Sequence, residues 1–266
     1  MRKCYISTIL NGNDNYQLIS ETIKILKNKI GVEYFTFEIN DLEEKKLKSL
    51  YQVFGALPST FHSPMRKAEP TAVKFSFEYQ KLIENLERTL KLCGEFGSSS
   101  IVFHSNNCFI EEADRLSKQA NAKENCLLLN QMCKTYGVTL LVETLGLPTQ
   151  GAPIFNNREY IDFIIDYNLS ALIDIGHMNL NGYDYEYTIK NLNRRILSYH
   201  LHNNNGIDDT HQTIDNGTFD YNIFIDLYKK YTPQADLVFE YIEIPNLSAN
   251  KLAEDINYLL NQLKNN

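Results

Sequence analysis

The sequence contains six histidines, and each comes at or just after the end of a short apolar run. They are His62, His104, His177, His200, His202 and His211. Four carboxylates occupy equivalent places, namely Glu143, Asp174, Asp209 and Glu240. Imidazole and carboxylate together form the usual ligand set for Zn²⁺, Mn²⁺, Co²⁺ or Fe²⁺. The residue types therefore predict a divalent-metal centre, provided that the fold brings these run ends together.

Three of the carboxylates directly follow apolar residues, so their side chains are expected to point into or just above the core. Glu143 ends LLVE, Asp174 ends ALID and Glu240 ends LVFE. An unpaired charge buried at such a place costs several kcal/mol. A bound cation would offset that cost. A single histidine at a run end is usually structural, so the argument depends on all six occurring together.

Eight short runs rich in β-branched and aromatic residues alternate with longer stretches of helical periodicity. The runs cover residues 4–9, 34–39, 58–61, 100–104, 139–144, 171–175, 197–201 and 237–242, and helices are predicted, for example, over 75–96, 124–136 and 247–263. No G-x-G-x-x-G motif follows the first run, where the turn reads NGNDN, which disfavours a doubly wound nucleotide-binding sheet. The count predicts an α/β protein with a single (βα)8 TIM-barrel domain over residues 1–266.

In a TIM barrel, the carboxyl ends of the strands and the loops after them form one rim, which carries the active site. All six histidines and the four carboxylates fall on that predicted rim. His202 is interpreted as facing the opposite way from His200 on the same strand. It is therefore expected to have a structural or substrate-orienting role rather than to be a ligand.

Composition and charge exclude several other classes of protein. A chain of 266 residues with 43% hydrophobic residues is not disordered. The 26 Lys and Arg against 33 Asp and Glu, a net charge of −7, disfavour a sequence-independent nucleic-acid coat. No run approaches a membrane span or a signal-peptide core, and the five cysteines show no C-x-x-C pair. We expect a cytoplasmic protein with no membrane partner, whose cysteines are small core residues.

The rim residues, from about His62 to Glu240, resemble the xylose isomerase-like TIM-barrel superfamily. This superfamily includes sugar-phosphate isomerases and epimerases and the endonuclease IV type of AP endonuclease, family 2. In the isomerases and epimerases, one divalent metal is held at the ends of strands five to eight by residues matching Glu143, Asp174, His200 and Glu240. In the endonucleases, a three-metal cluster has further ligands matching His62 and His104, with Glu143 bridging, and matching His177, Asp209 and His211. The segment HLHNNNGIDDTH is similar to an H-L-H-D-N-x-G…D-x-H pattern of isomerase-like members.

The sequence also departs from this family pattern. Asn203 stands where an Asp is common, and Asp215 replaces the first Gly of a G-x-G pair. The loop after the second run, EINDLEEKK, is acidic at its start, and the loop after the third, HSPMRKAEP, lacks an aromatic wedge. These departures disfavour a DNA substrate more than they disfavour metal binding.

The resemblance and the residues lead to two hypotheses about the reaction. The first is isomerisation or epimerisation of a sugar or sugar phosphate through a metal-bound enediolate, with Glu143 and Glu240 transferring the proton. His177 is then also catalytic and His202 contacts the substrate. If the substrate carries a phosphate, Arg66, Lys67 or Arg158 binds it. The second is a multinuclear zinc phosphoesterase of the AP endonuclease type. The expected cofactor is one to three ions, of Zn²⁺ or Mn²⁺. A small carbohydrate is the expected substrate, a nucleic acid is the less favoured one, and homo-oligomerisation stays open.

Overall fold

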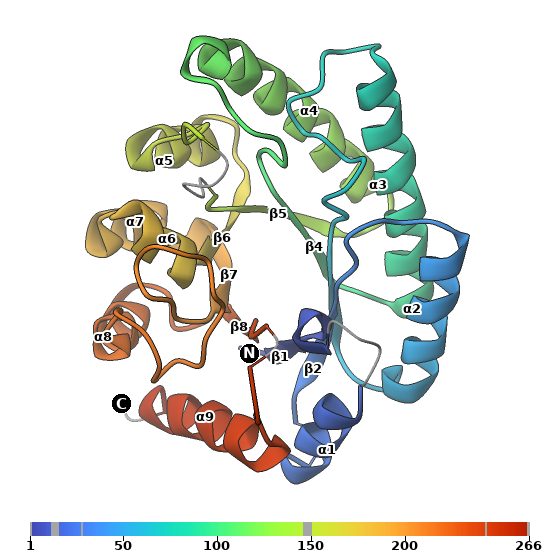
Figure 1. Cartoon of the computed structure of the whole chain (residues 1–266). Coiled ribbons are helices and arrows are strands. Elements are labelled where there is room, and N and C mark those ends of the chain that lie inside the picture. The colour runs from blue at the N-terminus through green and yellow to red at the C-terminus, as the bar shows by residue number, and fades with distance from the viewer. Residues whose placement is uncertain (1, 12–15, 28, 146–150, 243, 265–266) are drawn as a thin grey trace.

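Eight parallel strands close into a barrel in the computed structural model, and helices surround it (Figure 1). Neighbouring strands pair in chain order, and β8 pairs with β1 to close the ring. The strands are β1 (Cys4–Ser7), β2 (Gly31–Tyr34), β3 (Ser59–His62), β4 (Ser100–Phe103), β5 (Thr139–Glu143), β6 (Ser170–Asp174), β7 (Ile196–Leu201) and β8 (Asp236–Phe239). The predicted (βα)8 TIM barrel is therefore confirmed, while the extent of one domain over 1–266 stays a prediction.

The structure describes residues 2–11, 16–27, 29–145, 151–242 and 244–264. Most of the NGNDN turn after the first strand, residues 12–15, lies outside this part of the chain. The helices are α1 (Gln17–Ile25), α2 (Asp41–Phe54), α3 (Phe77–Phe96), α4 (Arg115–Thr135), α5 (Asn157–Asp166), α6 (Ile175–Asn181), α7 (Tyr185–Leu192), α8 (Tyr221–Tyr231) and α9 (Ala249–Gln262). Several begin at a side-chain cap, such as Asn40, Ser76 and Ser248, that accepts a backbone N–H of the first turn.

The barrel interior has an apolar floor below the predicted rim. Val102, Leu141 and Leu172 form a small buried cluster that is separate from the large core between strands and helices. Side chains two residues apart on a strand point to the same face. Glu143 and Asp174 therefore lie one layer above Leu141 and Leu172, inside the mouth of the barrel.

The second strand lies three residues before its predicted position. It spans Gly31–Tyr34, whereas the aromatic run at 34–39 mostly forms the loop that follows, with Phe37 at 45% exposure. A Cβ atom at Gly31 would come within 2.3 Å of the Pro58 carbonyl oxygen and 2.6 Å of the Tyr5 ring. Only glycine fits this close packing, so the strand begins with a residue of low strand propensity. Glu33 therefore lies in the strand and is fully buried.

Helix α4 begins nine residues before its predicted start at 124. In its first half, two of the three buried side chains, Gln119 and Asn125, are polar, and only Ala122 is apolar, so this half has no apolar stripe. Gln119 donates a hydrogen bond to the Ile154 carbonyl, and Asn125 donates to those of Pro70 and Ala72. The helix thus fixes two rim loops through hydrogen bonds.

All five cysteines are free thiols, and four of them are buried, as expected for core residues. Cys108 is only half-buried, near the Lys118 ammonium. Within the described residues, no helix has the length and apolar character needed to cross a membrane.

Candidate metal centre

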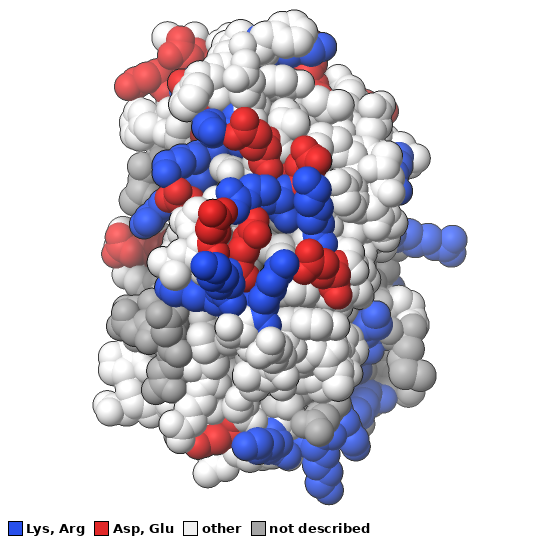
Figure 2. All heavy atoms as spheres, turned by 90° about the vertical axis from the view of Figure 1, so that its right-hand side faces the viewer, with Lys and Arg blue, Asp and Glu red and all other residues white. Residues whose placement is uncertain are grey.

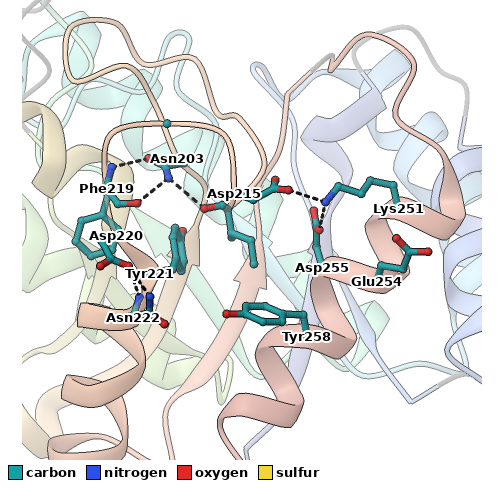
Figure 3. A pocket seen from close by; sticks show the side chains of 12 residues that line it. Asn203, Asp215, Phe219, Asp220, Tyr221, Asn222, Lys251, Glu254, Asp255 and Tyr258 are labelled. Carbon is teal, nitrogen blue, oxygen red and sulfur yellow. Dashed lines mark hydrogen bonds and ion pairs between the residues drawn. The ribbon is translucent and has the colours of Figure 1, made fainter.

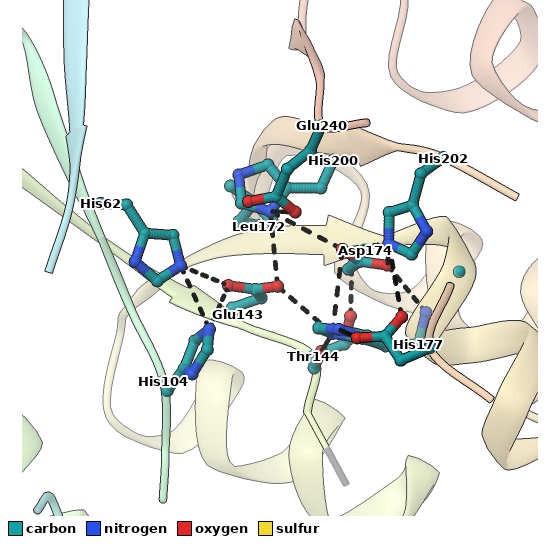
Figure 4. A network of polar contacts seen from close by, with 12 residues as sticks. His62, His104, Glu143, Thr144, Leu172, Asp174, His177, His200, His202 and Glu240 are labelled. Carbon is teal, nitrogen blue, oxygen red and sulfur yellow. Dashed lines mark hydrogen bonds and ion pairs between the residues drawn. The ribbon is translucent and has the colours of Figure 1, made fainter. Parts of the chain in front are cut away.

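Ten of the described side chains, nine predicted ligands and His202, converge in the mouth of the barrel. Figure 4 labels all of them except Asp209 and His211. We divide the predicted ligands into three groups. The first group is His62, His104 and Glu143; the central group is Glu143, Asp174, His200 and Glu240; the third group is His177, Asp209 and His211. Glu143 belongs to the first two groups, and His177 of the third group lies 3.3 Å from Glu143 Oε1, so the three groups form one connected cluster.

In the first group, two imidazole nitrogens and a carboxylate oxygen face one another. The Nε2 atoms of His62 and His104 are 3.1 Å apart, and they lie 3.5 Å and 3.0 Å from Glu143 Oε2. One proton cannot bond all three atoms at once. Ligand atoms of a tetrahedral zinc, with bonds of about 2.0–2.1 Å, are about 3.3 Å apart. The group therefore fits a divalent cation.

The central group surrounds one nitrogen of His200. Its Nδ1 atom is 3.1 Å from Glu240 Oε2, 3.4 Å from Glu143 Oε1 and 3.6 Å from Asp174 Oδ2. This buried nitrogen makes no hydrogen bond within the described part of the chain, and neither does Glu143 Oε2. Three carboxylates around one unpaired nitrogen are costly without a cation, so this group also fits one.

The third group is carried by the start of α6 and the loop after β7. His177 Nε2 lies 3.3 Å and His211 Nε2 lies 3.0 Å from Asp209 Oδ2. His211 has a φ of 43°, a left-handed conformation that non-glycine residues rarely adopt. Its surroundings must therefore hold it there.

In four of the ligand histidines, Nδ1 faces an oxygen atom that does not belong to a ligand carboxylate. The Nε2 atom of each ring is therefore free to bind an ion. The Nδ1 atoms of His62, His177 and His211 lie 2.8, 2.9 and 2.7 Å from the carbonyl oxygens of Ser63, Thr144 and Glu240. The Nδ1 atom of His104 lies 3.1 Å from Asn107 Oδ1. A carbonyl only accepts, so each Nδ1 carries the hydrogen and each neutral ring turns its Nε2 lone pair inward. Metal-binding histidines have this arrangement.

Without a bound ion, these side chains strongly shift one another's pKa values. Burial of His211 opposes its protonation, but Asp209 outweighs this and raises the pKa of His211 to about 9. Carboxylates likewise raise the pKa values of His177 and His200 despite burial. Burial opposes ionisation of Glu143, but the neighbouring histidines hold its pKa well below its usual value. The carboxylates are thus ionised at neutral pH, and a metal ion would take the place of protons.

The orientation predicted for His202 is wrong. Its Nε2 atom lies 3.0 Å from both carboxylate oxygens of Asp174, so its ring points toward the centre and not away from it. The error has a simple cause: His200 and His202 are two residues apart, and such side chains share a face.

Glu33 is a buried member of the site that the sequence did not reveal. Its oxygens lie 3.3 and 3.4 Å from His200 Nε2, on the side of the ring opposite the central group. A carboxylate on the outer nitrogen fixes the orientation of a metal-binding imidazole and makes it a stronger ligand. The sequence-based prediction starts the second strand at residue 34, which leaves Glu33 outside the sheet, so Glu33 is not recognised as a site residue.

Asn203, one of the departures from the family pattern, organises the loop that carries Asp209 and His211 (Figure 3). Its side-chain NH₂ donates to the carbonyls of Ile214 and Phe219 at 3.1 and 3.0 Å, and its backbone pairs with Gln212. An Asp could not donate these hydrogen bonds. The second departure, Asp215, accepts from Lys251 of α9 at 2.8 Å and ties the same loop to that helix.

The two predicted substrate-binding arginines lie in different surroundings. Arg66 is exposed beside a pocket of about 280 Å³ at the carboxyl ends of β1 and β2, with its guanidinium 5.2 Å from the Phe37 ring centroid. Arg158 lies on the surface of α5, 80% exposed and 3.7 Å from Asp162. Neither contacts the ligand cluster in the described structure.

The family model described as xylose isomerase-like TIM barrel matches residues 26–262 of this chain. A search of curated proteins finds no match.

Solved structures with the same fold include enzymes of two kinds. A D-tagatose 3-epimerase-like protein has a TM-score of 0.72 at 19% identity, with 98% of each chain covered. The IolI protein with a bound zinc atom has a TM-score of 0.77 at 14% identity, covering 98% of this chain and 97% of that one. An AP endonuclease of family 2 from Brucella melitensis has a TM-score of 0.72 at 18% identity, covering 97% and 99%. At these identities the likeness establishes the fold.

Replacing Glu33 by Gln should weaken ion binding at the central group by about 10–100-fold, the range for loss of a carboxylate behind a metal-binding histidine. Gln keeps the size of the side chain but removes its charge. Calorimetric titration of chelator-treated protein with Zn²⁺ measures the effect. Glu186→Gln, at an exposed glutamate that pairs with Lys230, serves as the control. Equal affinities in both variants would refute the role of Glu33.

Replacing Asn203 by Asp should lower the free energy of unfolding by at least about 2 kcal/mol, because two buried carbonyls lose their donors and a charge is buried. It should also reduce the ion content, since the loop no longer holds Asp209 and His211. Urea denaturation and elemental analysis test both effects. Asn250→Asp, at an exposed position in the first turn of α9, is the control and should lower neither. A variant as stable as the parent would contradict the assignment.

Proposed function

The chain belongs to the xylose isomerase-like TIM barrel family, and we propose that it is a divalent-metal-dependent isomerase or epimerase of a sugar or sugar phosphate. The observation that carries the proposal is the arrangement of two glutamates around His200. Glu143 and Glu240 come from different sides of the barrel, at the ends of β5 and β8, and lie 3.4 and 3.1 Å from His200 Nδ1. Two carboxylates so placed can act on opposite sides of one bound substrate.

The reaction needs a base that removes a proton beside a carbonyl and an acid that returns it. Glu143 and Glu240 are both held ionised: burial opposes this, but nearby histidines lower the pKa values of both carboxyls. Either carboxylate can take the proton. The acid that returns one is then that same carboxyl or, for an epimerisation, the other glutamate once a proton from solvent has reached it. A divalent ion in the central group would polarise the carbonyl of the substrate. His177, held by the Thr144 carbonyl, is placed to orient a substrate oxygen.

The charges outside the barrel mouth support a small substrate over a duplex. Figure 2 shows the face over α2 and α3, where basic and acidic side chains alternate. Arg88 contacts Asp41 and Glu44 at 2.7 and 2.6 Å, and Lys67 of the rim contacts Glu38 at 2.5 Å. A duplex-binding surface needs unpaired basic side chains along the backbone path. On this face, Arg88 and Lys67 are instead paired with carboxylates.

Arg66 favours a substrate that carries a phosphate. Among the described residues, no carboxylate lies within ion-pair distance of its guanidinium. Phe35 lines the same pocket and its ring centroid is 4.9 Å from that of His62, so the pocket adjoins the first group. A guanidinium at this place could bind the phosphate of a sugar whose other end reaches the glutamates. Arg158, already near Asp162, is the weaker candidate.

A second function, hydrolysis of a phosphate ester by a multinuclear centre, is favoured by one specific observation. Glu143 presents one oxygen to His62 and His104 and the other to His177 and His200. A one-ion isomerase has no need of His62, His104, Asp209 and His211 together. Two or three ions could instead activate water and neutralise a leaving oxygen.

Elemental analysis of the purified protein distinguishes the two reactions. One Zn²⁺ or Mn²⁺ per chain is expected for the isomerase. His104→Ala should then keep that ion and most of the activity on the sugar substrate, because Glu143 is the only central-group residue that the His104 side chain contacts among the described residues, and that carboxylate keeps its contacts to His177 and His200. Glu143→Ala should be inactive in either case. Two or three tightly held zinc ions, with a large loss of activity in His104→Ala, would overturn the isomerase in favour of the phosphoesterase.

The role of Arg66 is testable once a screen of sugars and sugar phosphates finds a substrate. Arg66→Ala should raise KM for the phosphorylated substrate by about 10-fold or more, the effect of losing one charged hydrogen bond, and leave kcat nearly unchanged. Arg158→Ala is the matched control and should change little. An equal effect of both substitutions would count against a phosphate site at Arg66.

A further inference from the structure

His202 contacts residues of both the central group and the third group of ligands. Its ring is fully buried, and its Nε2 atom lies 3.0 Å from each carboxylate oxygen of Asp174, a central-group residue (Figure 4). Its flat face stacks on His211 of the third group, with ring centroids 3.7 Å apart and planes inclined by 9°. One imidazole therefore joins the two groups.

The surrounding chain holds this ring in place. A Cβ atom at residue 176 would come within 2.0 Å of the His202 ring, so glycine is needed there to admit it. Tyr221 donates a hydrogen bond to the His202 carbonyl at 2.9 Å, and Asn204 donates to the Gly176 carbonyl at 2.9 Å. The position of the ring is thus determined by packing and hydrogen bonds on both sides.

The geometry separates His202 from the ligand histidines, although its Nε2 atom lies near the third group. Within the described residues its buried Nδ1 atom has no acceptor, whereas the outer nitrogens of the ligand histidines face oxygens. The hydrogen is therefore on Nε2, directed at Asp174. In addition, a ligating lone pair lies in the ring plane, so two parallel stacked rings cannot both direct lone pairs at one ion.

We propose that His202 is a positioning residue that couples the central and third groups, so that an ion in one raises the affinity of the other. An ion held by Asp174 orders that carboxylate, and its hydrogen bond then orders His202. The ordered ring in turn supports His211, which is held in a left-handed conformation. Such coupling is reciprocal. The coupling requires an ion in each of the two groups, so the inference rests on the multinuclear centre of the second proposed function, which the ion content of the parent protein tests separately.

A double-mutant cycle read out by metal binding tests the proposal without an activity assay. Zn²⁺ affinities of chelator-treated protein are measured by competition with a chromophoric chelator, and ion content by elemental analysis. Asp209→Ala removes the third ion. In the parent protein, this substitution should also lower the affinity for the remaining ions by about 10-fold. In the His202→Phe background, Asp209→Ala should cause no further weakening.

Two substitutions at His202 break the two contacts separately. Phe keeps the stacked ring but cannot donate a hydrogen bond to Asp174, so it should lower the affinity of the central group for its ion. Gln places a donor near the same point but removes the ring. It should therefore leave the ion affinity of the central group unchanged and still abolish the coupling between the two groups. Circular dichroism checks that both variants fold. The proposal is overturned if His202→Phe lacks one ion while the others bind as before, which would make His202 a ligand. It is also overturned if the coupling survives in both variants.

Discussion

The hydrogen bonds on the outer nitrogens of the ligand histidines are the constraint on which the rest of the site depends. Backbone carbonyls hold Nδ1 of His62, His177 and His211, and the Asn107 side chain holds that of His104. His200 is turned the other way, with Glu33 on Nε2 and Nδ1 toward the carboxylates. Each ring is thereby fixed with a lone pair toward a shared centre. Lone pairs and ionised carboxylates at this spacing are stable together only around positive charge.

The barrel supplies the platform for this arrangement. Inward-facing side chains recur every second residue, so an apolar layer at Val102, Leu141 and Leu172 lies beneath the layer of ligands. The floor excludes water from below and lowers the local dielectric, which strengthens the interactions of the buried charges. The large core between strands and helices then fixes the strands that carry the ligands.

The rim loops add what the strands cannot provide. Asp209 and His211 belong to no strand, and the hydrogen bonds of Asn203 and the Asp215–Lys251 ion pair shape their loop. Helix α4 fixes two other loops with Gln119 and Asn125. The buried side chain of Asn203 thus serves to place two of the metal-binding residues.

The sequence by itself determined the barrel and the residues at its rim. Alternating runs set the number of strands, and the strand ends selected nine side chains that do meet in space, because parallel strands bring their carboxyl ends to one face. Tertiary structure alone decided the place of Glu33, since close packing against Pro58 and Tyr5 put a glycine at the start of its strand. It also decided the roles of His202 and Asn203. Their contacts are with residues distant in sequence, Asp174 for His202 and Phe219 for Asn203, and local residue pattern carries no information about such partners.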